Sequence, residues 1–546
     1  MLSKGAAALL LVMCSVIPLV AAAAAAAVSP AAACRSSFYP KLCVAMLSPL
    51  RSRSATSQYE YGKYSVRQAL RQVRRTAALL DGYLAGRLGG ARAHRGVGGG
   101  GALGDCRELA GLSAEYLAEA QAELGRRAAR PDAAAAGRVR ALMSAVVTNQ
   151  QTCYDGLLAS RDGSFPELQS SLANGTQLYG VSLGLVNTAL GRSSAAGNAG
   201  PSSSSGGQTS PSTAGRSLVE ELSQIVPVKL SQSGLRVAQD GTGDFTSISE
   251  AVAFAPNDTA AATAGYFVVY VSEGVYRENV VVPMNKRNLI LIGAGINRTV
   301  ITSNHSVGDG WTTFNSATFA VNGERFIAVG ITFENTAGAA KYQAVAVRNS
   351  ADLTIFYRCS FLGYQDTLYV HTLRQFYRDC DVYGTVDFIF GNAAAVFQNC
   401  NLYARLPLPG QSNVVTAQGR TMPEQATGIS IHNCTVRAVP ELGRAARTFL
   451  GRPWKAYSRT VFMQSFIDGA VDPAGWLEWN GAPAPSTIYY GEFQNYGAGA
   501  DTVGRVKWPG FSLMNSGDAF NFTLFNFTAT DAWLSSTSIP YNSGLL

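Results

Sequence analysis

The chain has 546 residues, of which 47% are hydrophobic and 15% charged, a composition that excludes a disordered protein and fits a globular secreted one. Length alone predicts about three to four domains, or fewer if one domain is long and repetitive. The net charge of +8 does not indicate a nucleic-acid partner, because residues 1–216 carry 22 Lys/Arg against 11 Asp/Glu and residues 217–546 carry 22 against 25. The arginines of the first part are scattered among alanines at helical spacing, without a basic-aromatic stripe.

Residues 1–27 have the features of a secretory signal peptide, or of a signal anchor that stays in the membrane. Lys4 precedes a long apolar run that ends among small residues. No second apolar run of membrane-spanning length follows it. We therefore expect a secreted protein of the extracellular space with no membrane contact after processing. Seven Asn-x-Ser/Thr motifs are candidate glycosylation sites in such a protein: Asn174, Asn257, Asn297, Asn304, Asn433, Asn521 and Asn526.

Residues 28–190 are predicted to form a helical domain. They are rich in Ala, Leu, Arg and Glu, with apolar residues three to four positions apart. Residues 105–127 and 137–160 are the clearest amphipathic segments. Short loops between such helices favour an antiparallel bundle.

A flexible linker is predicted after the helical domain. Residues 191–216 consist almost wholly of Gly, Ser, Ala, Thr and Pro. The two halves on either side of it differ in composition and hydrophobic pattern, so we assign residues 191–227 to a linker and processing region.

The cysteines predict disulfides and not a zinc site. Cys14 would leave with the signal peptide, and the remaining eight form an even set in an exported chain. Neither Cys-x-x-Cys nor His-x-x-x-His spacing occurs. We expect no metal site.

Residues 228–546 are predicted to form a solenoid of short strands. Runs rich in Val, Ile, Phe, Tyr and Thr alternate there with Gly, Asn and Asp turns. One small pattern recurs, with successive spacings of 28, 21, 20 and 34 residues, in ITFEN (331–335), CSFLG (359–363), CDVYG (380–384), CNLYA (400–404) and CTVRA (434–438). Such repeats favour a parallel β-helix. The cysteines at 359, 380 and 400 would form a column, in which Cys380 and Cys400 could close a disulfide across neighbouring coils.

Asp366 and Asp387 are 21 residues apart, about one coil of such a solenoid. Residues one coil apart lie side by side, because neighbouring strands are about 4.8 Å apart. Two carboxylates that close cannot both ionise freely, so one becomes an acid and the other a base or nucleophile. Gln343 and Gln365 are spaced to form a ladder with Asp387 and could donate to an oxyanion.

Arg452 and Trp454 complete the candidate site. The arginine can keep a carboxylate ionised or bind an acidic substrate, and the tryptophan suits stacking on a sugar ring. This set permits ester hydrolysis through an aspartate nucleophile and equally permits glycoside hydrolysis, which also needs two carboxylates. The residues alone leave both reactions open.

The second half resembles plant pectin methylesterases over residues 228–546. The motifs that carry the resemblance are GDGWTTFNSATFAV (308–321), ITFENTAG (331–338), QAVAVR (343–348), YRCSFLGYQDTLYVH (357–371), GTVDFIFGNAAAVFQNC (384–400), VTAQGRT (415–421), LGRPWKAYSRTV (450–461) and AGWLEW (474–479). The resemblance implies an all-β right-handed parallel β-helix that hydrolyses methyl esters of homogalacturonan in the plant cell wall, without a metal or organic cofactor.

The resemblance also implies a role for each site residue. Asp387 would be the nucleophile, Asp366 the proton donor and later the base, and Gln365 the stabiliser of the oxyanion. Substrate contacts would come from Thr313, Gln343, Arg452 and Trp454, of which Gln343 would assist Gln365 and Arg452 would orient Asp387.

The first half resembles the inhibitor-like pro-region of the same enzymes, through CRSSFYPKLC (34–43), DCRELA (105–110) and TNQQTCYDGL (148–157). This resemblance implies an all-α four-helix bundle with disulfides Cys34–Cys43 and Cys106–Cys153. It also implies a pro-domain that inhibits the enzyme before export and is cut off near Arg216.

We expect a monomer whose partners are methyl-esterified homogalacturonan, its own pro-domain and inhibitor proteins. The alternatives to the esterase are a pectin-cleaving hydrolase on a similar solenoid, a wall polysaccharide-binding protein with a silent site, and an inhibitor bundle fused to a passenger.

Overall fold

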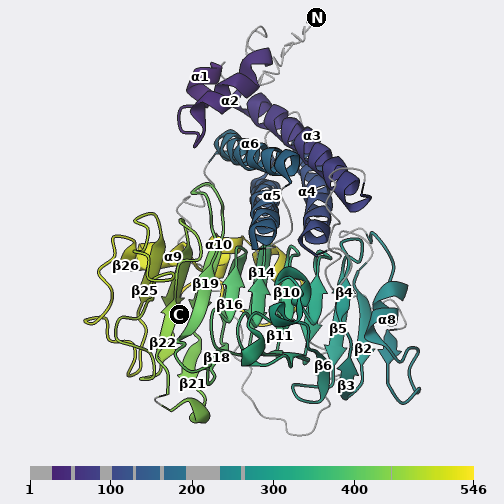
Figure 1. Cartoon of the computed structure of the whole chain (residues 1–546), viewed down its shortest axis with the longest axis vertical. Helices are drawn as coiled ribbons and strands as arrows, with labels where there is room; N and C mark the ends of the chain where they lie inside the picture. Colours follow the sequence, from purple (N-terminus) through teal and green to yellow (C-terminus); the bar gives the residue numbers. More distant parts are fainter. Residues whose placement is uncertain are drawn as a thin grey trace, which may run out of the picture.

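The computed structural model describes residues 28–50, 56–86, 101–126, 131–159, 165–191, 234–259, 265–443, 445–529 and 531–546. In these residues a helical bundle precedes a long β-helix (Figure 1). The predicted signal sequence (1–27), nearly all of the linker and Arg216 lie outside the described residues. Among the described helices, none combines the length and the apolarity needed to cross a membrane.

Four long helices form the bundle, and two short ones precede them. The helices are α1 (Pro30–Ala33), α2 (Pro40–Leu47), α3 (Gln58–Leu84), α4 (Gly101–Gly125), α5 (Ala133–Ala159) and α6 (Pro166–Leu190). Ser57 caps α3, since its hydroxyl accepts a hydrogen bond from the Glu60 backbone N–H at 3.3 Å. Apolar faces of α3 to α6 pack into one core, which confirms the predicted four-helix bundle.

Both predicted disulfides of the bundle are present. Cys34–Cys43 joins the residue after α1 to α2, with 5.7 Å between the Cα atoms. Cys106–Cys153 joins α4 to α5, with 4.6 Å between the Cα atoms. The second bond fixes the two helices whose ends reach the β-helix in Figure 1.

Three parallel sheets make up the β-helix, which confirms the predicted class of fold. In the described residues, the eleven-stranded sheet contains β1 (Leu235–Val237), β2 (Phe267–Val271), β5 (Leu289–Gly293), β8 (Ile327–Val329), β11 (Thr354–Tyr357), β14 (Arg374–Arg378), β17 (Ala394–Gln398), β20 (Gly428–His432), β23 (Arg459–Met463), β25 (Tyr489–Phe493) and β26 (Phe511–Leu513). The eight-stranded sheet contains β3 (Gly274–Arg277), β6 (Thr299–Ser303), β9 (Thr332–Asn335), β12 (Ser360–Leu362), β15 (Asp381–Gly384), β18 (Asn401–Ala404), β21 (Thr435–Ala438) and β24 (Phe466–Ile467). The seven-stranded sheet contains β4 (Val280–Val282), β7 (Phe319–Val321), β10 (Val347–Asn349), β13 (Leu368–Val370), β16 (Ile389–Gly391), β19 (Asn413–Gln418) and β22 (Thr448–Gly451).

The repeat seen in the sequence is one corner of the coil. The chain passes from the eleven-stranded to the eight-stranded sheet through a residue with positive φ, which directly precedes each cysteine of the repeat. These residues are Arg358 (50°), Asp379 (52°), Asn399 (54°) and Asn433 (53°). Asparagine and aspartate tolerate this region better than most residues, so the corner explains the Asx-Cys pairs of the repeat.

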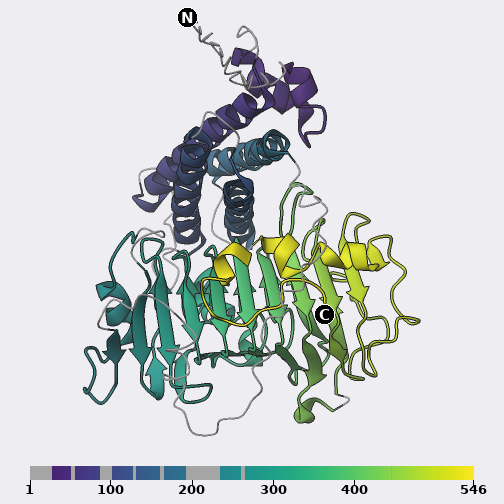
Figure 2. The same ribbon diagram turned by 180° about the vertical axis from the view of Figure 1, so that it is seen from behind.

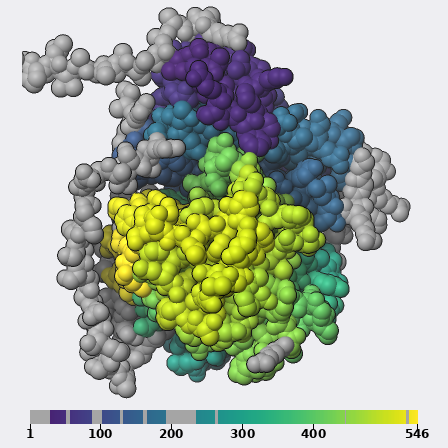
Figure 3. All heavy atoms as spheres, turned by 90° about the vertical axis from the view of Figure 1, so that its left-hand side faces the viewer, coloured from purple at the N-terminus to yellow at the C-terminus, as the bar shows by residue number. Residues whose placement is uncertain are grey.

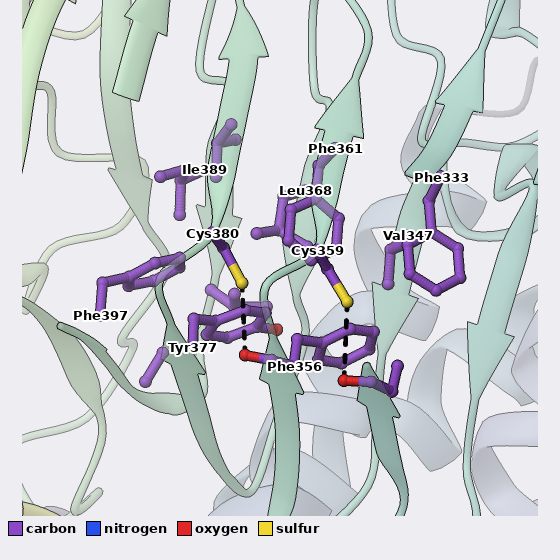
Figure 4. Packing of buried hydrophobic residues seen from close by; sticks show 14 of the residues in the cluster. Phe333, Val347, Phe356, Cys359, Phe361, Leu368, Tyr377, Cys380, Ile389 and Phe397 are labelled. Carbon is purple, nitrogen blue, oxygen red and sulfur yellow. Dashed lines mark hydrogen bonds between the residues drawn. The ribbon is translucent and has the colours of Figure 1, made fainter. Parts of the chain in front are cut away.

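The predicted Cys380–Cys400 disulfide is wrong: both residues are free thiols, as are Cys359 and Cys434. Neighbouring strands in register hold their Cα–Cβ vectors parallel and about 4.8 Å apart, whereas a disulfide needs Cβ atoms about 3.8 Å apart. The thiols instead point into the core, where Cys380 Sγ donates to the Phe356 carbonyl at 3.3 Å (Figure 4). Stacked rings surround them, with Tyr377 and Phe397 centroids 4.4 Å apart.

Among the described residues, helices and the C-terminal segment cover two of the three outer faces of the β-helix. The short helices α9 (Ser516–Phe520), α10 (Leu524–Thr528) and α11 (Asp531–Leu534) and the last residues lie along the eleven-stranded sheet (Figure 2). The bundle packs directly on the β-helix (Figure 3) and buries the outer face of the seven-stranded sheet. A further helix, α8 (Ile248–Phe254), lies near the N-terminal end of the β-helix.

Candidate active site

The seven-stranded sheet brings Asp366 and Asp387 together. Each lies two residues before a strand, β13 or β16, and those strands pair in register, with Leu368 opposite Ile389. The Asp366 N–H donates to the Val386 carbonyl at 3.1 Å, which extends the same register to the two aspartates. They are therefore neighbours one strand apart, as the spacing predicted.

Both aspartates have a left-handed backbone, with φ of 63° at Asp366 and 51° at Asp387. This region costs a non-glycine residue free energy, and such residues cluster at functional sites. The surrounding coil maintains the conformation, because the residues that follow each aspartate enter a strand at once. Sequence alone had not indicated this feature.

Arg452 holds Asp387 with two hydrogen bonds. Its Nε donates to Oδ1 at 2.8 Å and its Nη2 to Oδ2 at 2.6 Å. The Arg452 Cζ lies 4.4 Å from the ring centroid of Trp479. A bidentate pair of this kind fixes the carboxylate in position and favours its ionised form.

The two carboxyls differ in protonation. Burial raises the pKa of Asp366 well above its usual value, and the nearby Asp387 charge raises it further. Burial also raises the pKa of Asp387, but the Arg452 guanidinium opposes that rise through its hydrogen bonds and its charge. The pair therefore retains its proton on Asp366 and its charge on Asp387.

The predicted ladder of Gln343, Gln365 and Asp387 is only partly present. The Ala344 N–H donates to the Gln365 carbonyl at 3.2 Å, so the segments that carry the two glutamines adjoin. The next coil is offset by 21 residues and not 22, which places Asp387 beside Asp366. The ladder prediction is therefore wrong in its last step. Gln343 and Gln365 are half-buried.

Thr313 and Trp454 lie on two other segments that border the seven-stranded sheet. Thr313 is half-buried and precedes the short 3-10 helix Phe314–Ser316. Trp454 lies in the loop after β22 and contacts Phe390 edge to face, with 6.1 Å between ring centroids. The predicted site residues thus come from the loops that border the seven-stranded sheet.

An aromatic platform that the sequence did not indicate lies beside the aspartates. Tyr369 and Phe390 point outward from β13 and β16 and stack, with centroids 4.2 Å apart and ring planes 14° apart. Their spacing of 21 residues equals that of Asp366 and Asp387. This shared interval was the signal that could have identified them.

The bundle covers this platform. Side chains of α3 to α6 form one hydrophobic cluster with outward residues of the β-helix. The β-helix residues in that cluster are Phe314, Ala317, Ala320, Val345, Tyr369, Leu373, Phe390, Ala417 and Met422. Access to the sheet face beside Asp366 and Asp387 is therefore restricted while the bundle is in place.

Hydrogen bonds supplement the apolar contact. The Tyr116 hydroxyl donates to the Ser350 carbonyl at 3.0 Å, and Asn392 Nδ2 donates to the Thr148 hydroxyl at 2.9 Å. The Thr152 hydroxyl lies 2.9 Å from His371 Nε2, and burial lowers the pKa of this histidine well below its usual value.

Charged residues form a second network between the two parts. Arg138 of the bundle lies 2.7 Å from Glu119 and donates to both carboxylate oxygens of Glu324, which belongs to the β-helix. Arg287 of the β-helix donates to Glu119 at 2.6 Å. Asp352 is 3.9 Å from Arg138. This network positions α4 and α5 on the β-helix.

The arrangement is suited to acyl transfer. An ionised carboxylate held by an arginine can attack a carbonyl carbon, and a protonated one beside it can supply the leaving group with a proton. In the described part of the chain, no three His, Cys, Asp or Glu side chains gather as metal ligands would.

Comparison with known proteins gives two family matches. Residues 234–531 match the family Pectinesterase. Residues 29–185 match the family Plant invertase/pectin methylesterase inhibitor.

Similar proteins carry the same pair of descriptions. The chain is 49% identical over 558 residues to the Arabidopsis thaliana "Probable pectinesterase/pectinesterase inhibitor 25", covering 95% of this chain and 87% of that protein. It is 53% identical over 320 residues to "Pectinesterase 2" of Citrus sinensis, covering 58% of this chain and 61% of that protein.

A solved structure, "Pectin methylesterase from Carrot", is 52% identical with a TM-score of 0.56 and covers 58% of this chain and 99% of its own. That share of this chain has about the size of the β-helix. A similar β-helix is therefore stable without a helical bundle attached.

Proposed function

This chain belongs to the pectinesterase family and carries an inhibitor-type domain before its pectinesterase domain, and on that basis we propose how its own residues hydrolyse the ester. The substrate is methyl-esterified homogalacturonan, and the products are the free carboxylate polymer and methanol. The observation that carries the proposal is the pair of carboxyls one strand apart, of which only Asp387 is held by Arg452.

In the first half of the reaction, an Asp387 oxygen attacks the ester carbonyl carbon. The tetrahedral oxyanion accepts hydrogen bonds from Gln365, assisted by Gln343. When the intermediate collapses, the carbon–methoxy bond breaks and the proton of Asp366 passes to the departing methoxy oxygen. Methanol leaves, and the galacturonyl group remains bound to Asp387 as an anhydride.

In the second half, the now ionised Asp366 takes a proton from water. The resulting hydroxide attacks the galacturonyl carbonyl and breaks the anhydride, which frees Asp387 and restores the proton on Asp366. Thr313 and Trp454 contact the sugar units during both halves.

A methanol-release assay on esterified pectin tests the proposed reaction. Residues 217–546 should release methanol without creating new reducing ends, because an ester and not a glycosidic bond is broken. New reducing ends would indicate the pectin-cleaving hydrolase. Intact β-helix structure without either product would indicate a binding protein with a silent site.

Asp366→Asn in residues 217–546 should lower the rate of methanol release by about 10²- to 10⁴-fold, because asparagine cannot supply or accept the proton. The raised pKa of Asp366 means that wild-type activity is present below that pKa and declines as pH rises through it. The variant should lose this alkaline decline. A pH–rate profile measures both effects, and an unchanged profile would refute the acid–base role.

The bundle silences the enzyme until export to the cell wall. The support for this is the burial of Tyr369 and Phe390, beside the aspartates, in one cluster with side chains of α3 to α6. The signal sequence would direct export, and cleavage near Arg216 would separate the two parts. Sequencing the N-terminus of the mature protein tests this step.

A further inference from the structure

Asp155 and Lys455 form an ion pair between the bundle and the loop that carries the site arginine. Lys455 Nζ lies 2.9 Å from Oδ1 and 2.8 Å from Oδ2 of Asp155. Gln151, one turn earlier on α5, donates to Oδ1 at 2.8 Å and so orients the carboxylate. The lysine side chain is 22% exposed and the aspartate 27%, so the pair is still open to solvent.

The place of this pair connects it to the reaction. Lys455 follows Trp454 directly and comes three residues after Arg452, whose guanidinium holds Asp387. Its Nζ lies 5.3 Å from the Trp454 ring centroid. Thr152, one turn before Asp155 on α5, lies 2.9 Å from Nε2 of His371, the residue that directly follows β13. Asp155 therefore lies over the bundle-covered face of the seven-stranded sheet, close to the end of the strand that follows Asp366.

We propose that Lys455 is a specificity-determining residue that binds the free carboxylate of a galacturonate unit beside the ester being hydrolysed, and that Asp155 occupies this subsite in the uncleaved chain. The inference rests on the proposed function. Once Asp155 is removed, the Lys455 ammonium beside the Trp454 ring can donate a charge-assisted hydrogen bond to the carboxylate of an acidic sugar.

Other carboxylates of the bundle fit this role less well. Glu108 lies 3.4 Å from Arg348, but that arginine is 2% exposed and its charge lies 3.5 Å from the Phe314 ring centroid. Asp105 pairs with Asn315, a neutral side chain, and burial raises the pKa of Asp105 to about 6. Lys455 is more exposed than Arg348, and both carboxylate oxygens of Asp155 lie close to its ammonium group.

The test uses residues 217–546, because the solved carrot structure is a similar β-helix with no bundle attached. Methanol release by the wild type and Lys455→Gln is measured at low ionic strength on fully esterified and on partly de-esterified pectin. The variant should raise KM for the partly de-esterified polymer roughly three- to tenfold, with kcat and the KM for fully esterified pectin unchanged. The inhibition constant of polygalacturonate should rise by a similar factor.

Lys507→Gln is the matched control, since Lys507 is exposed and lies in the turn before β26. It removes the same charge and should leave both KM values unchanged. Equal changes in the two lysine variants, equal changes on the two substrates, or no change in Lys455→Gln would each overturn the subsite. A wild type that releases no methanol would instead refute the proposed function, and the subsite with it.

Discussion

Replacing Asp387 by asparagine is expected to lower methanol release from residues 217–546 by at least about four orders of magnitude. The amide cannot form the anhydride with the galacturonyl group, and no second carboxylate can take its place, because Asp366 must supply the proton. Conservative substitutions elsewhere on the β-helix should not lower methanol release in this way. Initial rates of methanol release on esterified pectin measure the loss.

The fold should survive this change. Asparagine has nearly the same volume and can accept one of the two hydrogen bonds from Arg452. Asp381→Asn is the matched control: it makes the same substitution on β15, in the eight-stranded sheet, where Asp381 accepts from Asn401 at 2.8 Å. Both variants should show the circular dichroism of the wild type, and only Asp387→Asn should lose activity. Substantial turnover by folded Asp387→Asn would exclude the nucleophilic role.

Separating the bundle from the β-helix should give the second large effect, a rise in activity. A tethered domain experiences an effective concentration of about 1 mM, so even a micromolar affinity would keep roughly 99.9% of the sites covered. Residues 217–546 should therefore release methanol up to about 10³-fold faster than the intact chain. Equal specific activities of the two proteins would contradict inhibition.

Arg138→Glu in the intact chain tests the same inhibition by the bundle without removing residues. The new carboxylate would face Glu119, Glu324 and Asp352, which now surround the arginine. Repulsion should loosen the bundle and activate the intact chain, although Arg138 belongs to the bundle and contacts neither Asp366 nor Asp387 in the interactions described above. Arg126→Glu, at an exposed position on the bundle, should leave the intact chain silent.

The coil length was readable from sequence because the β-helix repeats one corner. A left-handed residue precedes each buried cysteine at the same turn, and two of these cysteines, Cys359 and Cys380, are 21 residues apart. That period placed Asp366 beside Asp387. It did not indicate their left-handed backbone, because aspartate is common in turns of many conformations.

The features that were predicted wrongly from the sequence depend on local geometry, which the length of the repeat does not determine. A column of cysteines predicts adjacency, but the parallel orientation of Cys380 and Cys400 prevents a disulfide. The position of Gln365 beside Val386 depends on where a coil gains or loses one residue. The contact of Asp155 with Lys455 joins residues 300 apart in sequence, which no local pattern relates.

Trapping the covalent intermediate tests most directly whether Asp387 is the nucleophile and Asp366 the acid and base. A p-nitrophenyl ester of an oligogalacturonate needs no acid to expel its leaving group, so Asp366→Asn should still transfer the galacturonyl group to Asp387. Without a base to activate water, the adduct should persist. We predict a burst of p-nitrophenol equal to the enzyme concentration and a peptide containing Asp387 that carries the added galacturonyl mass. Continued turnover without a burst, or an adduct on a peptide that lacks Asp387, would contradict the mechanism.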